Sequence, residues 1–119
     1  MSNINDVLTT LLATDGALAA ALVDSSSGML LGGIGTGIDL DVAAAGNTEV
    51  MRAKLATLKS LQLNDSIDDI LITLSTQYHI IRPLAANSEV FLYVVLDKNR
   101  SNLALARLNT KTADASITL

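Results

Sequence analysis

The residues of this chain that could do chemistry are few and are spread along the sequence. Asp24 is followed by the run Ser25–Ser27, which could place a nucleophile beside an acid. A serine hydrolase also needs a base, and His79 is the only histidine. Nothing in the sequence places His79 near the serines. We therefore interpret residues 24–28 as a tight turn, in which Asp and Ser bond their own backbone.

Composition removes several other kinds of site. The chain has no cysteine, which excludes disulfides, thiolate metal sites and cysteine nucleophiles. The single histidine excludes any site built on two imidazoles. We expect His79 to be structural or partly exposed, and a pH-sensitive contact at an interface is the one functional role that suits it. No catalytic residue, metal ligand or cofactor is therefore predicted.

Three acidic residues, Asp65, Asp68 and Asp69, could supply the oxygen ligands that calcium or magnesium prefers. Their spacing fits no EF-hand loop, and the alternation of side chains along a strand would send Asp68 and Asp69 to opposite faces. We interpret them as solvated charges that discourage uncontrolled pairing at the edge of a sheet.

A glycine-rich segment, Gly32–Gly37, separates a predicted strand from a predicted helix. The dinucleotide fingerprint would need a glycine, and the nucleoside-triphosphate loop a lysine, where Ile38 stands. The amides at the helix start leave weak anion binding as an alternative, but Asp39 and Asp41 would repel a phosphate. The segment is interpreted as a flexible crossover in which the strand ends.

Length and charge limit the class of protein. The 119 residues suffice for one domain, which we assign to residues 1–119. Hydrophobic residues make up 50% of the chain and charged residues only 17%, against about 25% in an average soluble domain. This balance excludes disorder and indicates that a partner covers part of the apolar surface. The net charge of −4 argues against nucleic acid as a ligand. Without a signal peptide or a run of about 18 apolar residues, we expect a cytoplasmic protein with no membrane insertion.

Hydrophobic periodicity predicts eight elements in the order α-β-β-α-β-β-β-α. They span residues 2–14, 17–23, 29–34, 39–61, 67–75, 78–84, 89–96 and 101–112. Ser2 and Asp39 are the expected N-caps of the first two helices. The runs Ala17–Val23 and Glu89–Leu96 are apolar almost throughout, which indicates strands covered on both faces. The hairpin connections make the five-stranded sheet mostly antiparallel, and helices on both sides of it give a three-layer α/β/α sandwich.

The faces of the helices follow from steps of about 100° per residue. In the helix at 39–61, the stripe expected on the sheet is Leu40, Ala44, Met51, Leu55 and Leu58. A polar face of the same helix contains Asp41, Thr48, Glu49, Arg52 and Lys59. In the last helix, the residues expected to point inward are Leu103, Leu105, Ala106 and Leu108.

A third stripe of the long helix carries small, mostly uncharged side chains: Ala43, Gly46, Val50, Ala53 and Thr57. Such a stripe lets another backbone approach closely, and a monomer has little reason to leave it bare. The strand at 67–75, which contains Ile70 and Ile72, is expected at an edge of the sheet, where it invites pairing with another chain. We therefore predict a homodimer in which a second copy covers the helix and the strand together.

The sequence resembles the roadblock/dynein light chain (Roadblock/LC7) domain family over nearly its whole length. The resemblance rests on the segments ALAAALVDSSSGMLLGGIG and VFLYVVLDKNRSNLALARL, with the long helix and ILITLS between them. Profilin-like and longin-like domains share a related architecture. The resemblance implies a roadblock-like domain that dimerises through its third strand and long helix, with one sheet running across two chains.

The resemblance also implies a function. Members of this family serve as regulators or scaffolds of Ras-like small GTPases or as motor-associated light chains, and a bacterial relative activates a polarity GTPase. We therefore expect a non-enzymatic, homodimeric interaction module with a Ras-like GTPase as its partner. A small-ligand or anion sensor and a motor-associated adaptor stay open as alternatives. Arg82 and Arg100 are candidates for an arginine finger, although they rank no higher than ordinary surface arginines.

Overall fold

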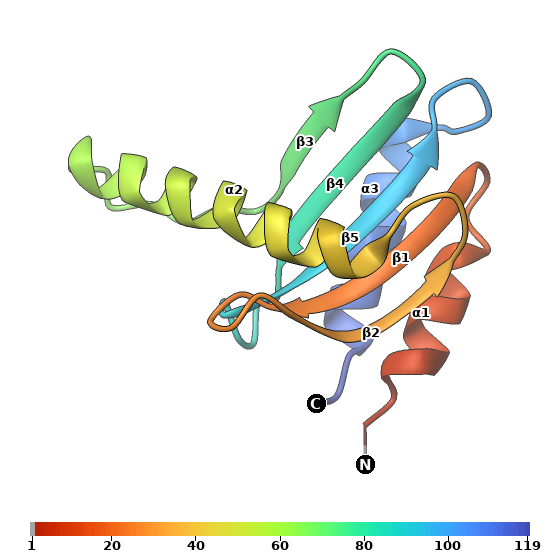
Figure 1. Ribbon diagram of the computed structural model, residues 1–119, viewed down its shortest axis with the longest axis horizontal. Coiled ribbons are helices and arrows are strands. Elements are labelled where there is room, and N and C mark those ends of the chain that lie inside the picture. Colours follow the sequence, from red (N-terminus) through yellow and green to blue (C-terminus); the bar gives the residue numbers. More distant parts are fainter. Residues whose placement is uncertain (1) are drawn as a thin grey trace.

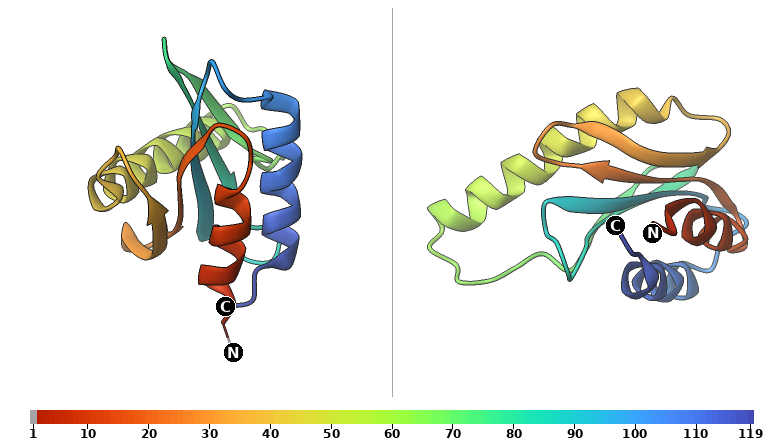
Figure 2. Two further views of the ribbon diagram at one scale, coloured as in Figure 1. Left: turned by 90° about the vertical axis from the view of Figure 1, so that its right-hand side faces the viewer. Right: turned by 90° about the horizontal axis from the view of Figure 1, so that it is seen from below.

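The computed structural model describes residues 2–119 and confirms the predicted order of elements. The elements are α1 (Ile4–Leu12), β1 (Ala17–Asp24), β2 (Met29–Gly35), α2 (Leu40–Ser60), β3 (Ile70–Thr73), β4 (Gln77–Pro83), β5 (Val90–Asp97) and α3 (Leu103–Ser116). Helices α1 and α3 cover one face of the sheet and α2 crosses the other, which makes a three-layer α/β/α sandwich (Figure 1, Figure 2). Among the described residues, no helix is long and apolar enough to cross a membrane.

The five strands form one antiparallel sheet in the order β2-β1-β5-β4-β3. β1 and β5 lie next to each other inside the sheet. β5 is buried from Val90 to Leu96, which confirms that its continuous apolar run marks a strand covered on both faces. β3 is an edge strand, as predicted, but it is shorter than residues 67–75 because it pairs with β4 only from Ile70 to Thr73.

Two apolar clusters, one on each face of the sheet, hold the helices in place. Leu8 of α1 and Ala106 of α3 belong to one cluster, together with alternate side chains of the inner strands. Met51 of α2 and Tyr93 of β5 belong to the other. Because successive side chains of a strand point to opposite faces, β1 and β5 supply both clusters.

The glycine-rich segment is not the crossover that the sequence indicated, because β2 continues through it to Gly35. A β-carbon at Gly32 would lie 2.7 Å from Cγ2 of Ile4 in α1. One at Gly33 would lie 2.8 Å from Cδ1 of Leu40 in α2. Glycine therefore lets a helix lie close on each face of this edge strand, and packing accounts for a segment that looks like a phosphate loop.

The helix ends agree only in part with the predicted ones. Asp39 caps α2 as expected, and its Oδ1 accepts from two backbone amides of the first turn. The N-cap of α1 is Asn3 rather than Ser2, and the Asn3 side chain makes no capping bond. It donates instead to the carbonyl of Ser116, which ties the start of the chain to the end of α3. α3 extends to this residue, beyond the predicted end at 112.

Some side chains lie on other faces than predicted. Thr48 was expected on the polar face of α2, but it is buried, and its hydroxyl is satisfied by donating to the carbonyl of Ala44. Leu105 and Leu108 were expected to point inward, yet they are 42% and 57% exposed. The buried face of α3 consists of Ala106, Thr110, Ala113 and Asp114, and Leu105 and Leu108 lie off this face.

Candidate interaction surface

α2 presents an exposed face along most of its length, and the predicted stripe of small residues lies there. Ala43 packs partly against the core, whereas Val50 is 37% exposed and Ala53 and Thr57 are also exposed. A β-carbon at Gly46 would meet no atom within 4 Å. The backbone of α2 is therefore open to close approach at its middle.

The second half of α2 extends past the sheet (Figure 1). Met51 is the last buried residue of the helix. The prediction that Leu55 lies on the sheet is wrong, because α2 packs on β1 and β2 and then leaves them, so that Leu55 is 47% exposed. Leu61 and Leu63, just after the helix, are 60% and 51% exposed. The overhanging half of α2 thus carries apolar side chains that nothing in the described chain covers.

β3 is the last strand of the sheet, and one of its two edges is free. Ile70 and Ile72 lie at the margin of the apolar cluster beneath α2 and are half-buried. On its other side β3 pairs with no strand of residues 2–119. Its start is fixed by Arg107 of α3, which donates to both carboxylate oxygens of Asp69 at 2.9 and 2.8 Å. The start of the edge strand is therefore joined to α3.

A hydrogen-bonded network lies beside this edge. His79 of β4 stands opposite Ile72, with Nδ1 2.8 Å from the Tyr93 hydroxyl and Nε2 2.8 Å from Oε1 of Gln77. Because an amide oxygen only accepts, Nε2 carries the proton and Nδ1 accepts from the hydroxyl. Burial lowers the pKa of His79. Burial also raises the pKa of Tyr93. The network therefore holds a neutral imidazole next to the edge strand.

A cavity of about 420 Å³ opens between the overhanging half of α2 and the end of β4. Met51, Leu55 and Pro83 supply apolar side chains to its lining, and Asp65 and Asp68 supply carboxylates. Arg82 also lines the cavity, but its charge is paired with Asp114, so the two carboxylates make the cavity a poor site for a phosphate or another anion. Among residues 2–119, no group of three acidic or histidine side chains is placed to hold a metal ion.

The other residues singled out in the sequence have structural roles. The Asp24 carboxylate accepts from the hydroxyls of Ser26 and Ser27, which lowers the pKa of Asp24 and confirms the tight turn. His79 is not beside these serines, since its ring is bonded to Gln77 and Tyr93 instead. Arg82 is not free to act as a finger, because its Nε donates to the buried Asp114 at 2.9 Å. Arg100 is exposed.

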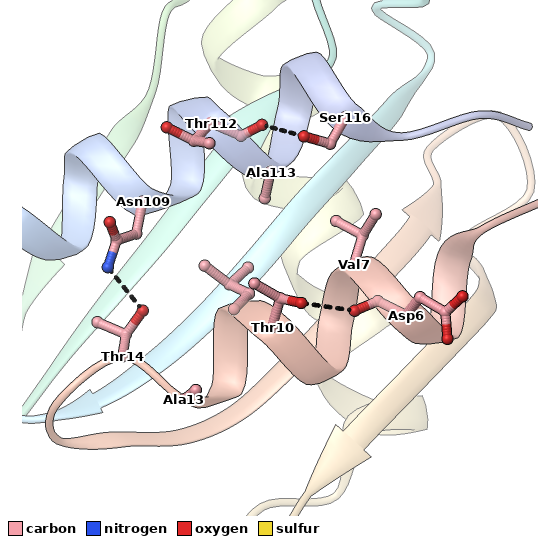
Figure 3. Close-up of a pocket in the computed structure, with 10 residues that line it drawn as sticks. Asp6, Val7, Thr10, Ala13, Thr14, Asn109, Thr112, Ala113 and Ser116 are labelled. Carbon is pink, nitrogen blue, oxygen red and sulfur yellow. Dashed lines mark hydrogen bonds between the residues drawn. The ribbon is translucent and has the colours of Figure 1, made fainter.

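Sequence reasoning missed a groove between α1 and α3, on the face of the sheet opposite α2 (Figure 3). It encloses about 390 Å³. The signal was available in part, because Asp6, Thr10 and Ala13 fall at positions i, i+4 and i+7 of the first helix, away from its apolar face. The other wall of the groove could not be recognised, because Leu105 and Leu108 were expected to point inward and the exposed face of α3 was therefore assigned wrongly.

Solved structures share this arrangement of elements, although no family model and no curated protein sequence matches the chain. MglB of Myxococcus xanthus has a TM-score of 0.82 at 23% identity, over 94% of this chain and 89% of that one. A Roadblock/LC7 domain from Streptomyces avermitilis has a TM-score of 0.83 at 14% identity, over 97% and 94%. An MglB structure with a tetrameric arrangement has a TM-score of 0.82 at 21% identity, over 93% and 82%. The chain therefore has the Roadblock/LC7 fold, as the resemblance in its sequence predicted.

Proposed function

We propose that this chain is a homodimeric, non-enzymatic interaction module that regulates or scaffolds a Ras-like small GTPase in the cytoplasm. The observation that carries the proposal is an uncovered surface on α2 and β3, which we call the α2–β3 surface. It consists of Ala43, Gly46, Val50, Ala53, Thr57, Ile70 and Ile72, together with Leu55. A monomer would keep this area in water, whereas a second copy related by a two-fold axis would cover it.

In the proposed dimer, the β3 edges of two chains pair and their sheets become continuous. Pairing satisfies the amides and carbonyls on the free side of β3, which otherwise face solvent. The overhanging half of α2 then has a surface to lie on, and Leu55 leaves water. Gly46 and Ala53 let the two long helices approach closely, because neither carries a side chain beyond a methyl group. The family resemblance and the tetrameric arrangement of one MglB structure support self-association.

The regulatory role is supported by the family resemblance. It is also supported by the structural roles of the histidine and of the serines after Asp24. His79 is held in a network with Tyr93, and the serines after Asp24 shape a turn. The chemical step of nucleotide hydrolysis would therefore come from the GTPase, and the dimer would act by holding the GTPase's own groups in place. The alternative of an anion sensor loses its main support, because the glycine segment that suggested it is a packed strand.

The dimer is tested by Ala53→Asp. Ala53 is exposed in the single chain, so the substitution should leave the fold intact, whereas an unpaired carboxylate within a closed interface is strongly unfavourable. The matched control is Ala45→Asp, which adds the same charge at an exposed residue of α2 outside the stripe. Light scattering at micromolar concentration should give dimers for wild type and Ala45→Asp and a monomer for Ala53→Asp. A monomeric wild type would overturn the proposal.

The partner is tested with a Ras-like GTPase encoded in the same genome, loaded with GDP or with a non-hydrolysable GTP analogue. Size-exclusion chromatography should detect a complex that forms with one nucleotide state in preference to the other. Hydrolysis measured with and without the dimer then separates a regulator, which changes the rate, from a scaffold, which does not. Absence of a complex in both nucleotide states rejects the GTPase role and leaves the dimer proposal standing.

A further inference from the structure

The groove between α1 and α3 has walls of defined composition. The two helices run antiparallel and side by side on the face of the sheet opposite α2 (Figure 2). Val7, Leu11 and Ala113 supply its apolar floor, and polar or small side chains rise from both helices (Figure 3). The polar and small wall residues are Asp6, Thr10 and Ala13 on α1 and Asn109, Thr112 and Ser116 on α3.

The polar atoms at one end of the groove are hydrogen-bond acceptors. The hydroxyls of Thr10, Thr112 and Ser116 each donate to a carbonyl of their own helix, at 3.0, 3.1 and 2.8 Å. Their oxygen lone pairs are left facing outward. The carboxylate of Asp6 makes no ion pair with any side chain of residues 2–119, and no lysine or arginine lines the groove. This end is therefore anionic and lacks donors to satisfy an anion.

Beyond the other end of the groove, where Asn109 donates to Thr14, the exposed face of α3 is apolar. Leu105 precedes Asn109 by one helical turn and continues the same face of α3, where it is 42% exposed. Leu108 lies beside it and is 57% exposed. Of the two cations of α3, Arg107 is bonded to Asp69 on another side of the helix, and Lys111 does not line the groove. Two exposed leucines thus follow the carboxylate end along one straight wall.

We propose that this groove binds an amphipathic helix of another protein, with apolar side chains on Leu105 and Leu108 and a lysine or arginine near Asp6. A helix of about three to four turns would match the length of the wall that α3 provides. Its apolar face would extend the packing of α1 and α3, and its cation would meet the acceptors that have no donor in this chain. The charge of the groove decides against an acidic helix.

This binding site is independent of the proposed dimer. The groove and the α2–β3 surface lie on opposite faces of the sheet (Figure 2). A dimer formed through α2 and β3 would leave both of its grooves open, so one particle could hold two copies of the helical partner. Monomeric Ala53→Asp should bind the helix as well as wild type does, which separates a failure of this proposal from a failure of the dimer.

The test uses two synthetic helical peptides of equal length, with leucines spaced three and four residues apart on one face. One carries lysine in both terminal turns and the other carries glutamate at the same places. In ¹⁵N-labelled protein, the lysine peptide should shift the backbone amides of Thr10, Ala13 and Thr112 and bind more tightly than the glutamate peptide. Asp6→Asn should weaken the lysine peptide about two- to fivefold, as expected for an exposed ion pair. Glu49→Gln, which removes an exposed carboxylate from α2, is the control and should change nothing.

Charge reversal makes the test decisive. With Asp6→Lys, the glutamate peptide should bind more tightly than the lysine peptide, because the proposal rests on the sign of this charge. Equal affinity of the two peptides for wild type, amide shifts confined to α2, or no binding by either peptide would each overturn the proposal. Circular dichroism confirms that the variants stay folded, as expected for substitutions at an exposed residue.

Discussion

At the residue scale, His79 joins β4 to the core through hydrogen bonds that require a neutral ring. Tyr93 donates to Nδ1, and Nε2–H donates to Gln77. A proton on Nδ1 would remove the acceptor that the Tyr93 hydroxyl uses. Burial opposes the charge as well, which is why the pKa of His79 is lowered.

The stability of the fold should therefore depend on pH through His79. In the unfolded chain the pKa of an imidazole is about 6.5, and in the folded chain the pKa of His79 lies lower. Above about pH 6.5 the ring is neutral in both states. As the pH falls below that value, the unfolded chain takes up the proton first, so the free energy of unfolding decreases until the folded chain is protonated too.

This dependence is measured by urea unfolding of wild type and His79→Gln at about pH 7.5 and about pH 5.5. The carboxylates titrate in both proteins, so their effect cancels in the difference. Wild type should lose more stability than His79→Gln on acidification. Equal losses in the two proteins would mean that the ring is accessible to protons without cost, and NMR titration of His79 would then give an ordinary pKa.

The pairing of His79 with Tyr93 could not be predicted from the sequence. His79 lies opposite Val95 and Ile81 lies opposite Tyr93, so the two rings are diagonal neighbours across β4 and β5. That contact depends on the register of two strands, which a shift of one residue would abolish. The sequence could identify a histidine on a half-buried strand, and it could not identify what the histidine bonds to.

At the element scale, prediction succeeded where one local signal determines the structure. Asp39 caps α2, and the unbroken apolar run of β5 marks a buried strand. Prediction failed where contacts with a neighbouring element determine the structure. The segment Gly32–Gly37 was interpreted as a flexible crossover, but β2 continues to Gly35, and Leu40 packs where a β-carbon of Gly33 would be. Leu105 was predicted to be a core residue, but α3 turns its Ala106, Thr110 and Ala113 side toward the sheet, which leaves Leu105 exposed.

α3 is joined to the sheet by a buried ion pair as well as by the apolar cluster. Asp114 accepts from Nε of Arg82 in β4 and from the amide of Ala85, and both charged side chains are largely buried. Asp114→Ala would leave the Arg82 guanidinium without its partner, and we expect a loss of about 3 kcal/mol in the free energy of unfolding. Chemical denaturation measures this loss.

The control for that prediction is the second pair that α3 makes with the sheet. Arg107 and Asp69 also form a hydrogen-bonded ion pair, but the Arg107 side chain is 49% exposed. Arg107→Ala should therefore lower the free energy of unfolding by less than about 1 kcal/mol. Similar losses for Asp114→Ala and Arg107→Ala would mean that burial does not distinguish the two pairs.

At the scale of the whole molecule, the two proposed interaction surfaces lie on opposite sides of the sheet. α2 and β3 leave apolar side chains uncovered on one side, and α1 and α3 form the groove on the other. The stripe of small residues on α2 could be predicted from the sequence, because it is visible in the spacing alone, and most of it is exposed. The sequence could not predict that the helix leaves the sheet after Met51, since this depends on where the strands lie beneath it.

Substitution of Gly46 should change the stability of the single chain and the strength of the proposed dimer in opposite directions. It lies inside α2, where glycine is less favourable than alanine by about 1 kcal/mol, and a β-carbon there would meet nothing within 4 Å. Gly46→Ala should therefore stabilise the monomeric Ala53→Asp background by up to about 1 kcal/mol in urea unfolding. In the proposed dimer, the same methyl group stands where two helices approach closely. The added methyl group should therefore weaken dimerisation about tenfold, which corresponds to about 1.4 kcal/mol. Analytical ultracentrifugation measures this change in affinity. A substitution that stabilises the monomer and leaves the dimer equally tight or tighter would place Gly46 outside the contact, because helix propensity alone cannot oppose association.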